Sequence, residues 1–165
     1  MKYLFITLSF LISTVICFAQ SRHYEKTISK LSSEANIKQM SFSKEAFGLL
    51  TYFDISMKEE LKNIIDDIEQ MKIITASTRS RTKFYDLAEK NFKDAGYSSV
   101  DLTKYGNIGQ SKAFIKSRFI YVREAHFVVD YGQGAVISFF GKFRMRDIRK
   151  LIKGADKVGA TSVGN

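Results

Sequence analysis

The segment from Val122 to Ile152 carries the clearest pattern of hydrophobic and polar positions in the chain. Two runs rich in β-branched and aromatic residues flank Gly132-Gln133-Gly134, and an amphipathic segment follows them. Extended runs on both sides of a glycine-containing turn are typical of a β-hairpin. The pattern therefore predicts two antiparallel strands followed by a helix, and we expect the rest of the chain to pack on this unit.

Side-chain alternation predicts the register of this hairpin. A three-residue loop, with Gly134 in the left-handed conformation, makes the facing pairs apolar: Tyr131 with Ala135, Val129 with Ile137, and Phe127 with Phe139. A two-residue loop would mix polar and apolar partners on both faces. The opposite face has a mixed composition and is expected to be partly exposed to solvent. It comprises Glu124, His126, Val128 and Asp130 against Val136, Ser138, Phe140 and Lys142.

Upstream of the hairpin, apolar residues at helical spacing predict four helices. The first lies within residues 20–36 and is weakly amphipathic through Tyr24, Ile28, Leu31 and Ala35. Ser43 is placed to cap the second, which follows a short strand at 37–42 and contains Phe47, Leu49, Leu50 and Phe53. A capping-box pattern, Ser56-Met57-Lys58-Glu59, opens the third, whose buried face holds Met57, Leu61, Ile64, Ile65, Ile68 and Met71. The fourth covers 82–95 and ends at Gly96, with Phe84, Leu87, Ala88, Phe92 and Ala95 inward.

Short segments between and after these helices predict further strands. Residues 72–77 are expected to form a buried strand, 97–102 an extended segment, and 112–119 an edge strand ahead of the hairpin, with a loop at 105–110. Strands in a run beside helices indicate an α+β fold, here a mainly antiparallel sheet with helices packed on one face in a two-layer sandwich. We expect the helices to cover the apolar face of the hairpin.

The first 19 residues have the pattern of a secretory signal peptide. Lys2 gives a positive start, residues 3–18 are almost entirely apolar, and Ala19 precedes the expected cleavage site. The apolar run is shorter than the roughly 20 residues that span a bilayer, which disfavours an uncleaved anchor. Lipoprotein processing at Cys17 is the other alternative, but Ile16 stands where such a site has Gly, Ala or Ser. The sequence thus predicts export to the periplasm or cell envelope, with no transmembrane span after cleavage.

Cleavage changes what the composition implies. The mature chain is long enough for a single domain at 37–153, between an N-terminal segment at 20–36 and a flexible tail at 154–165. The only cysteine leaves with the signal, so no disulfide is expected. The signal also removes one lysine, so the formal net charge falls from +9 to +8. A basic exported protein favours anionic partners, such as lipid head groups or acidic glycans, over nucleic acid.

Glu124, His126 and Asp130 are the one place where a histidine and carboxylates share a predicted strand face. A carboxylate can orient an imidazole and raise its pKa, so this group is the candidate for general acid–base chemistry. No nucleophile or phosphate-binding loop accompanies it, and the alternative is a solvated polar face, on which His126→Ala changes stability by about 0.5 kcal/mol or less. We find no cofactor motif, and no zinc site is expected because only His23 and His126 remain as nitrogen ligands, without cysteine.

The helix predicted at 144–153 presents a basic stripe on its outer side, made of Arg146, Arg149, Lys150 and Lys153. Its expected buried side is made of Met145, Ile148, Leu151 and Ile152. Like charges at neighbouring helical positions repel one another. The stripe is therefore either a solvated cationic face or the contact surface for an anionic envelope component or acidic protein, and we take it as the candidate partner-binding site.

Several stretches together resemble one known family. They are the strand-to-helix start at 37–50 with its Ser43-Lys44 step, LKNIIDDIEQMKIITAS, the helix end near Gly96-Tyr97, and the block from Glu124 to Leu151 that includes Gly141. The chain is similar to the small exported family of Bacteroidota bacteria catalogued as domain of unknown function four-two-five-two. This resemblance implies a cell-envelope role and brings no catalytic residues with it.

The expected function is therefore a non-enzymatic binding or interaction module of the cell envelope. Two alternatives stay open. One is an enzyme that acts through the face of Glu124, His126 and Asp130, and the other is a purely structural accessory protein.

Overall fold

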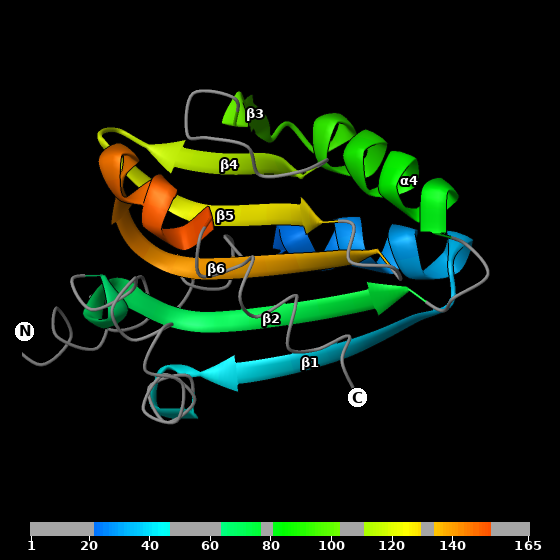
Figure 1. Cartoon of the computed structure of the whole chain (residues 1–165), viewed down its shortest axis with the longest axis horizontal. Helices are drawn as coiled ribbons and strands as arrows, with labels where there is room; N and C mark the ends of the chain where they lie inside the picture. Colours follow the sequence, from blue (N-terminus) through cyan, green and yellow to red (C-terminus); the bar gives the residue numbers. More distant parts are fainter. Residues whose placement is uncertain (1–21, 47–63, 77–80, 103–110, 130–133, 153–165) are drawn as a thin grey trace, which may run out of the picture.

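The computed structural model describes residues 22–46, 64–76, 81–102, 111–129 and 134–152, which form a six-stranded sheet with helices against it (Figure 1). The strands lie in the order β1-β2-β6-β5-β4-β3. Their bounds are Ile37–Ser43 (β1), Ile68–Ala76 (β2), Ser98–Val100 (β3), Lys112–Arg118 (β4), Tyr121–Val129 (β5) and Ala135–Arg144 (β6). Every pairing between neighbours is antiparallel, which confirms the α+β class with a mainly antiparallel sheet.

Two longer helices and several short turns accompany the sheet in the described residues. The N-terminal helix covers residues 22–34, and α4 covers Arg81–Asp94. A 3-10 turn, η1 (Ile65–Asp67), precedes β2, and another, η4 (Met145–Asp147), follows β6 and leads into a terminal helical segment at residues 148–152. None of the helices in this part of the chain is long and apolar enough to cross a bilayer.

The end of α4 agrees with the sequence prediction. Gly96 has a φ of +78°, a conformation that glycine adopts without steric cost. The N–H groups of Gly96 and Tyr97 donate to the carbonyls of Lys93 and Phe92, which satisfies the last carbonyls of the helix. Phe84, Ala88 and Phe92 are buried as predicted, while Leu87 and Ala95 are half-buried.

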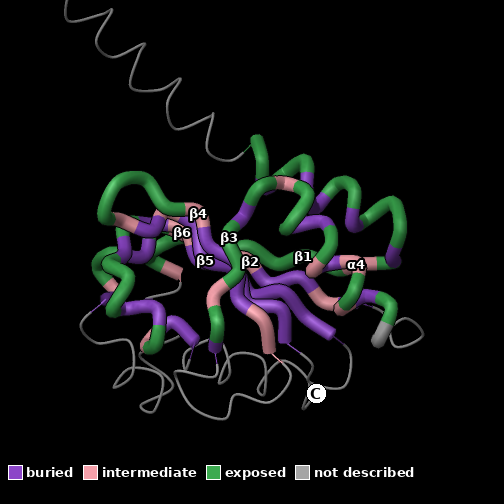
Figure 2. The backbone as a smooth tube through the Cα atoms, turned by 90° about the horizontal axis from the view of Figure 1, so that it is seen from above, coloured by how far each residue is buried: buried purple, intermediate pink, exposed green. Residues whose placement is uncertain are grey.

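Each face of the sheet is buried in its own hydrophobic cluster. On one face, the N-terminal helix and α4 enclose Tyr24, Leu31, Phe84, Phe92 and Val128, among others. On the other face, the terminal helical segment packs on a cluster that includes Phe127, Phe139, Phe143, Ile148 and Leu151. Figure 2 shows buried residues concentrated along the central strands. The alternation along β5 therefore sends neighbouring residues into two separate layers of core, as the period of two requires.

The hairpin register differs from the prediction by two residues. Val129 faces Ala135 and Phe127 faces Ile137, so the connection covers residues 130–134, of which 130–133 lie outside the described residues. A shift by an even number keeps every side chain on its predicted face. Gly134 has a φ of +69°, as expected for the left-handed position.

The prediction of one helix from Met57 to Met71 is wrong at its C-terminal end, and residues 57–63 lie outside the described residues. Ile68 and Met71 belong to β2, which pairs with β6. The ladder has a register shift between Ile68 and Gln70, and both Ile68 and Met71 lie in the same cluster. This irregularity adds one residue to the strand, so apolar residues on one face are spaced by three and imitate helical spacing.

The structure corrects two other predictions, the edge position of β4 and the face of the sheet that the helices cover. β4 was expected at an edge, but β3 pairs with its residues Ala113–Ile115 and takes the edge position. Helices were expected on one face only, that of Phe127 and Phe139. The terminal helical segment packs there, but the N-terminal helix and α4 cover the opposite face. Ser43 does accept a hydrogen bond from the N–H of Ala46 (3.3 Å) at the start of a helical stretch, and the rest of that predicted helix lies outside the described residues.

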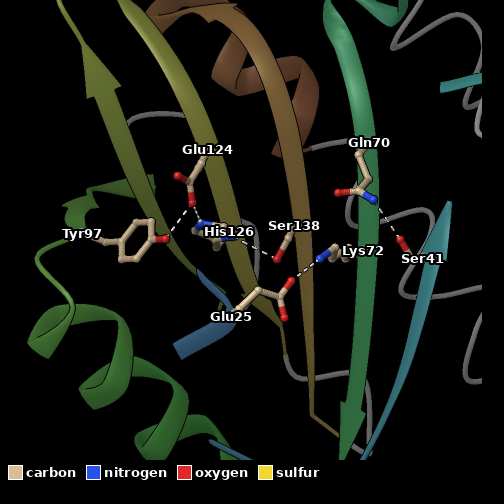
Figure 3. Close-up of polar contacts among 8 residues, drawn as sticks. All are labelled: Glu25, Ser41, Gln70, Lys72, Tyr97, Glu124, His126 and Ser138. Atoms are coloured by element: carbon tan, nitrogen blue, oxygen red, sulfur yellow. Dashed lines mark hydrogen bonds and ion pairs between the residues drawn. The ribbon is translucent and has the colours of Figure 1, made fainter. Parts of the chain in front are cut away.

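The N-terminal helix packs on the sheet through its predicted apolar face. Tyr24 and Leu31 are fully buried, and Ile28 and Ala35 are nearly so. Lys72 of β2 donates a hydrogen bond from Nζ to Glu25 Oε1 (2.5 Å; Figure 3). The same ammonium lies 4.9 Å from the centroid of the Tyr24 ring. This helix is therefore an integral part of the core that covers β5 and β6.

Candidate functional site

The candidate acid–base residues lie in a polar cluster under the N-terminal helix and α4. Glu124 and His126 of β5 point to the same side of the sheet as Ser138 of β6 (Figure 3). The Tyr97 hydroxyl donates to Glu124 Oε2 (2.7 Å), and Ser138 Oγ lies 2.9 Å from His126 Nδ1. His126 Nε2 is 3.5 Å from Glu124 Oε2, a contact too long for a strong hydrogen bond. The contacts connect β5, β6 and Tyr97, which lies between α4 and β3.

Aromatic rings surround the imidazole of His126. Tyr24 of the N-terminal helix stacks on it with 5.2 Å between ring centroids, and Phe92 of α4 does so at 4.7 Å. Tyr97 and Phe140 meet the imidazole edge-on. Two hydrogen bonds satisfy Glu124 Oε2 and His126 Nδ1, whereas Glu124 Oε1 and His126 Nε2 are buried without a hydrogen-bond partner among the described residues. Ring stacking on the imidazole allows two helices to pack on a strand face that looks polar in the sequence, although burying the two unpartnered atoms costs free energy.

Burial sets the protonation states in this cluster. It lowers the pKa of His126 below the ordinary value, against the opposing influence of Glu124. Burial also tends to raise the pKa of the Glu124 carboxyl, but the neighbouring His126, the Tyr97 hydroxyl and Lys116 outweigh it and hold that pKa below its usual range. The cluster therefore holds a neutral imidazole beside an ionised carboxylate near neutral pH.

The expectation of a partly exposed polar face is wrong for Glu124 and His126. Their exposed fractions are 1% and 0%. Neither residue lines the pocket at the η4 end of β6 or the pocket between the N-terminal helix and α4. Asp130, the third member of the predicted group, lies outside the described residues. The pair is therefore enclosed between the sheet and the helices that cover it.

A basic pocket lies at the end of the sheet where β6 leads into η4. Its volume of about 610 Å³ is typical of small-ligand sites. The lining combines strand, turn and helix residues, namely Asp67, Tyr121, Lys142, Arg144, Arg146, Asp147 and Lys150. Four cationic side chains and two carboxylates line this opening, so its charge balance is positive. We call these residues the basic pocket.

Most of the positive charge in the basic pocket is unpaired within the described part of the chain. Lys150 Nζ lies 3.4 Å from Asp147 Oδ1. Lys142, Arg144 and Arg146 form no ion pair with any described residue, and the Lys142 ammonium lies 4.4 Å from the centroid of the Tyr121 ring. Because like charges close together repel one another, an anion in the pocket would lower the electrostatic free energy. The planar guanidinium groups suit phosphate or carboxylate acceptors.

The basic pocket contains part of the predicted basic stripe. Arg146 and Lys150 line it. Arg149 is exposed but does not line the pocket, and Lys153 lies outside the described residues. The predicted stripe and the basic pocket thus share two cations, Arg146 and Lys150.

The predicted helix at 144–153 begins later than expected. Arg144 is the last residue of β6, and Met145–Asp147 form η4. Met145, which was expected to be buried, is 46% exposed, because it lies on this turn and not on the inner side of a helix. Ile148, Leu151 and Ile152 are buried as predicted.

Sequence reasoning missed Lys142, Arg144 and Tyr121. A signal for two of them was present, because Lys142, Arg144 and Arg146 recur at every second position, the period of a strand. The sequence prediction placed Lys142 on a strand and began a helix at Arg144, which divided these three cations between two elements. Tyr121 reaches the pocket through the β5–β6 ladder, where it faces Arg144. No local pattern marks that pairing.

A second pocket, of about 360 Å³, lies between the N-terminal helix and α4 and is lined by His23, Lys26, Thr27, Lys30, Asn91, Asp94 and Ala95. Lys30 Nζ lies 3.5 Å from Asp94 Oδ2, so part of its charge is neutralised. Nowhere in the described ranges do three or more His, Cys, Asp or Glu side chains gather as a metal site would require.

Fold and pocket together define a small antiparallel α+β protein with a cationic pocket at one end of its sheet. A family model described as "Domain of unknown function (DUF4252)" matches residues 24–151, and the chain belongs to this family. The match extends from the N-terminal helix to the terminal helical segment. Neither the search of curated proteins nor the search of solved structures finds a match.

Proposed function

We propose that this protein is an exported cell-envelope protein of Bacteroidota and a non-enzymatic binding module that holds an anionic partner at the basic pocket. The observation that carries the proposal is a group of three cations, Lys142, Arg144 and Arg146, that line one opening of about 610 Å³ and form no ion pair with any described residue. Electrostatic complementarity of this kind gives specificity and speeds association. A phosphorylated or carboxylated partner would supply anionic acceptors for these side chains.

Burial of the acid–base pair favours binding over catalysis. A general base must come within hydrogen-bond reach of the proton that it removes. His126 is 0% exposed, and Tyr24 and Phe92 stack on its ring. The alternative, an enzyme that acts through Glu124, His126 and Asp130, requires the N-terminal helix or α4 to leave the sheet before a substrate reaches the imidazole.

The export part of the proposal is supported by the signal-like pattern of residues 1–19. We expect the native protein, purified from the envelope of its host, to begin at Gln20 and to carry no lipid. Intact-mass spectrometry measures this directly. A species that begins at Cys17 with an added diacylglycerol mass would contradict the prediction and make the protein a lipoprotein.

The binding part of the proposal predicts that Lys142→Glu/Arg146→Glu weakens anion binding by at least about tenfold. A hydrogen bond to a charged group contributes roughly 1.5–3 kcal/mol, and about 1.4 kcal/mol corresponds to a factor of ten. Lys150 is left in place because it pairs with Asp147. The measurement is the Kd for fluorescein-labelled polyphosphate by fluorescence anisotropy at about 0.1 M salt, with Tm as a check on folding.

The matched control is Lys38→Glu/Lys83→Glu, which changes the net charge by the same amount at two exposed positions on β1 and α4. We expect its Kd to stay within about twofold of the wild-type value, since surface charges beyond a Debye length, about 10 Å at 0.1 M salt, interact weakly. Equal weakening by both double variants would show that net charge alone attracts the probe. It would contradict the proposal that the basic pocket is the binding site.

A further inference from the structure

We propose that the anionic partner is a lipid surface, and that the turn between β4 and β5 inserts Phe119 and Ile120 into it while the basic pocket holds the head groups. This inference rests on the proposed function, because it names the partner of the same pocket. It is carried by exposed apolar side chains beside cations that have no ion pair in the described part of the chain, and by the backbone of the turn.

Exposed apolar side chains are concentrated near the basic pocket. Among the described residues, four large hydrophobic side chains are exposed: Phe119 (92%), Ile120 (77%), Met40 (47%) and Met145 (46%). Ile120 directly precedes the pocket residue Tyr121, and Met145 stands between the pocket residues Arg144 and Arg146. Only Met40, on the edge strand β1, is remote in the sheet order. Exposed apolar groups gathered at one site indicate an interaction surface.

The β5–β6 ladder brings these groups to the same end of the sheet. Tyr121 pairs with Arg118 in β4 and with Arg144 in β6. The β4–β5 turn therefore lies beside the start of η4, as Figure 1 shows. Figure 2 shows the turn as an exposed loop at the rim of the molecule. A flat surface that meets this rim can contact the turn and the pocket cations together.

The backbone of the turn is unusual for a phenylalanine. Arg118 and Tyr121 are paired, so Phe119 and Ile120 form a two-residue turn. Phe119 has a φ of +57°, and it is the one non-glycine residue with positive φ in the described part of the chain. Glycine adopts this conformation freely, whereas a bulky side chain is disfavoured there. Turn geometry and burial do not favour an aromatic residue at this position, and the ring stays 92% exposed although Arg118 lies near it, so we infer a contact with a partner.

The surrounding charges favour a lipid surface with anionic head groups. Arg118 lies against the Phe119 ring, 5.9 Å from its centroid, and places a cation directly beside the apolar tip. Apolar side chains that enter the acyl boundary, together with basic groups at the level of the head groups, are the two elements of interfacial membrane binding. A second copy of the chain is disfavoured as the occupant, because it would place the same cations of the basic pocket against each other.

The chain has no tryptophan, so Phe119→Trp introduces a single fluorescent reporter at the tip. We expect its emission to shift to the blue with vesicles of equal parts phosphatidylglycerol and phosphatidylcholine, and to stay unchanged with phosphatidylcholine alone. Met40→Trp is the matched control at an exposed apolar position on β1, and its emission should stay unchanged with both vesicles. Added salt should reverse the shift.

Loss of the apolar tip separates this inference from the proposed function. We expect Phe119→Gly/Ile120→Ser to sediment with the anionic vesicles at least about tenfold less strongly, since burial of two such side chains contributes several kcal/mol. Its Kd for polyphosphate should stay within about twofold, and its Tm should be unchanged or higher because glycine suits the turn. Lys142→Glu/Arg146→Glu should lose both kinds of binding.

Two results would overturn the lipid inference. One is polyphosphate binding at the basic pocket without binding to anionic vesicles, which points to an acidic protein or soluble anion and leaves the proposed function intact. The other is vesicle binding of Phe119→Gly/Ile120→Ser equal to that of the wild type. Failure of the pocket variant to weaken either kind of binding would remove the proposed function as well.

Discussion

Gly141→Ala is expected to lower the free energy of unfolding by about 3 kcal/mol or more. A Cβ atom at this position would lie 1.9 Å from the carbonyl oxygen of Asp67 and 2.9 Å from Cζ of Phe143. The first of these is a backbone atom of η1, which crosses β6 where Ile68 pairs with Gly141. A flexible side chain cannot relieve the overlap, so η1 itself must move. Thermal and urea unfolding measure the loss, which corresponds to a Tm decrease of roughly 10 °C.

Gly96→Ala is the control for this prediction. Gly96 has a positive φ of +78°, but nothing lies within 4 Å of an added Cβ. Its substitution should therefore cost only the left-handed conformation, about 1–2 kcal/mol. Equal stabilities of the two alanine variants would show that η1 does not press on β6 in solution.

His126→Ala is expected to cost about 2–4 kcal/mol, well above the 0.5 kcal/mol or less that an exposed strand face implies. The substitution leaves a cavity between Tyr24 and Phe92, and it removes the partner of the Ser138 hydroxyl and the close neighbour of Glu124. His23→Ala is the matched control, because His23 is exposed on the N-terminal helix and should be nearly neutral. Urea unfolding at pH 8 measures both variants.

The cost of His126→Ala should also depend on pH. Burial lowers the pKa of His126 in the folded protein below its ordinary value of 6.5. As the pH drops below about 6.5, His126 binds a proton in the unfolded chain but not in the folded protein, so the stability of the wild type falls. The alanine variant lacks this loss, so its deficit should be larger at pH 8 than at pH 5.

Between pH 5 and pH 8, the titratable neighbours of His126 either change the stability deficit in the same direction or keep their protonation state. Burial raises the pKa of both Tyr24 and Tyr97, so both remain neutral. The pKa of Glu124 is held below 4.5, partly by His126, and should rise when the imidazole is removed. Folded Glu124 then binds a proton more readily, which also favours the variant at acid pH. A deficit that is constant between pH 5 and pH 8 would mean that His126 titrates equally in the folded and unfolded protein.

Local periodicity and capping were enough to predict much of the secondary structure. The run of Phe84, Ala88 and Phe92 followed by Gly96 identifies α4, because helix periodicity and its stop signal lie within a few residues of one another. The alternation along β5 and β6 likewise identifies two strands and the faces of their side chains. The prediction failed at Ile68 and Met71, where an irregularity in β2 spaces apolar residues as a helix does.

The sequence by itself determined the α+β class, the two faces of the hairpin and a basic region that includes Arg146 and Lys150, since each depends on residue type and local spacing. The tertiary structure alone decided that His126 is buried, because the N-terminal helix and α4 that cover it come from distant parts of the chain. It also decided the membership of the basic pocket, where sheet pairing brings Tyr121 beside Arg144. The burial of His126 and the meeting of the pocket residues both depend on contacts between segments that are remote in the sequence. No local pattern encodes which of these segments will meet.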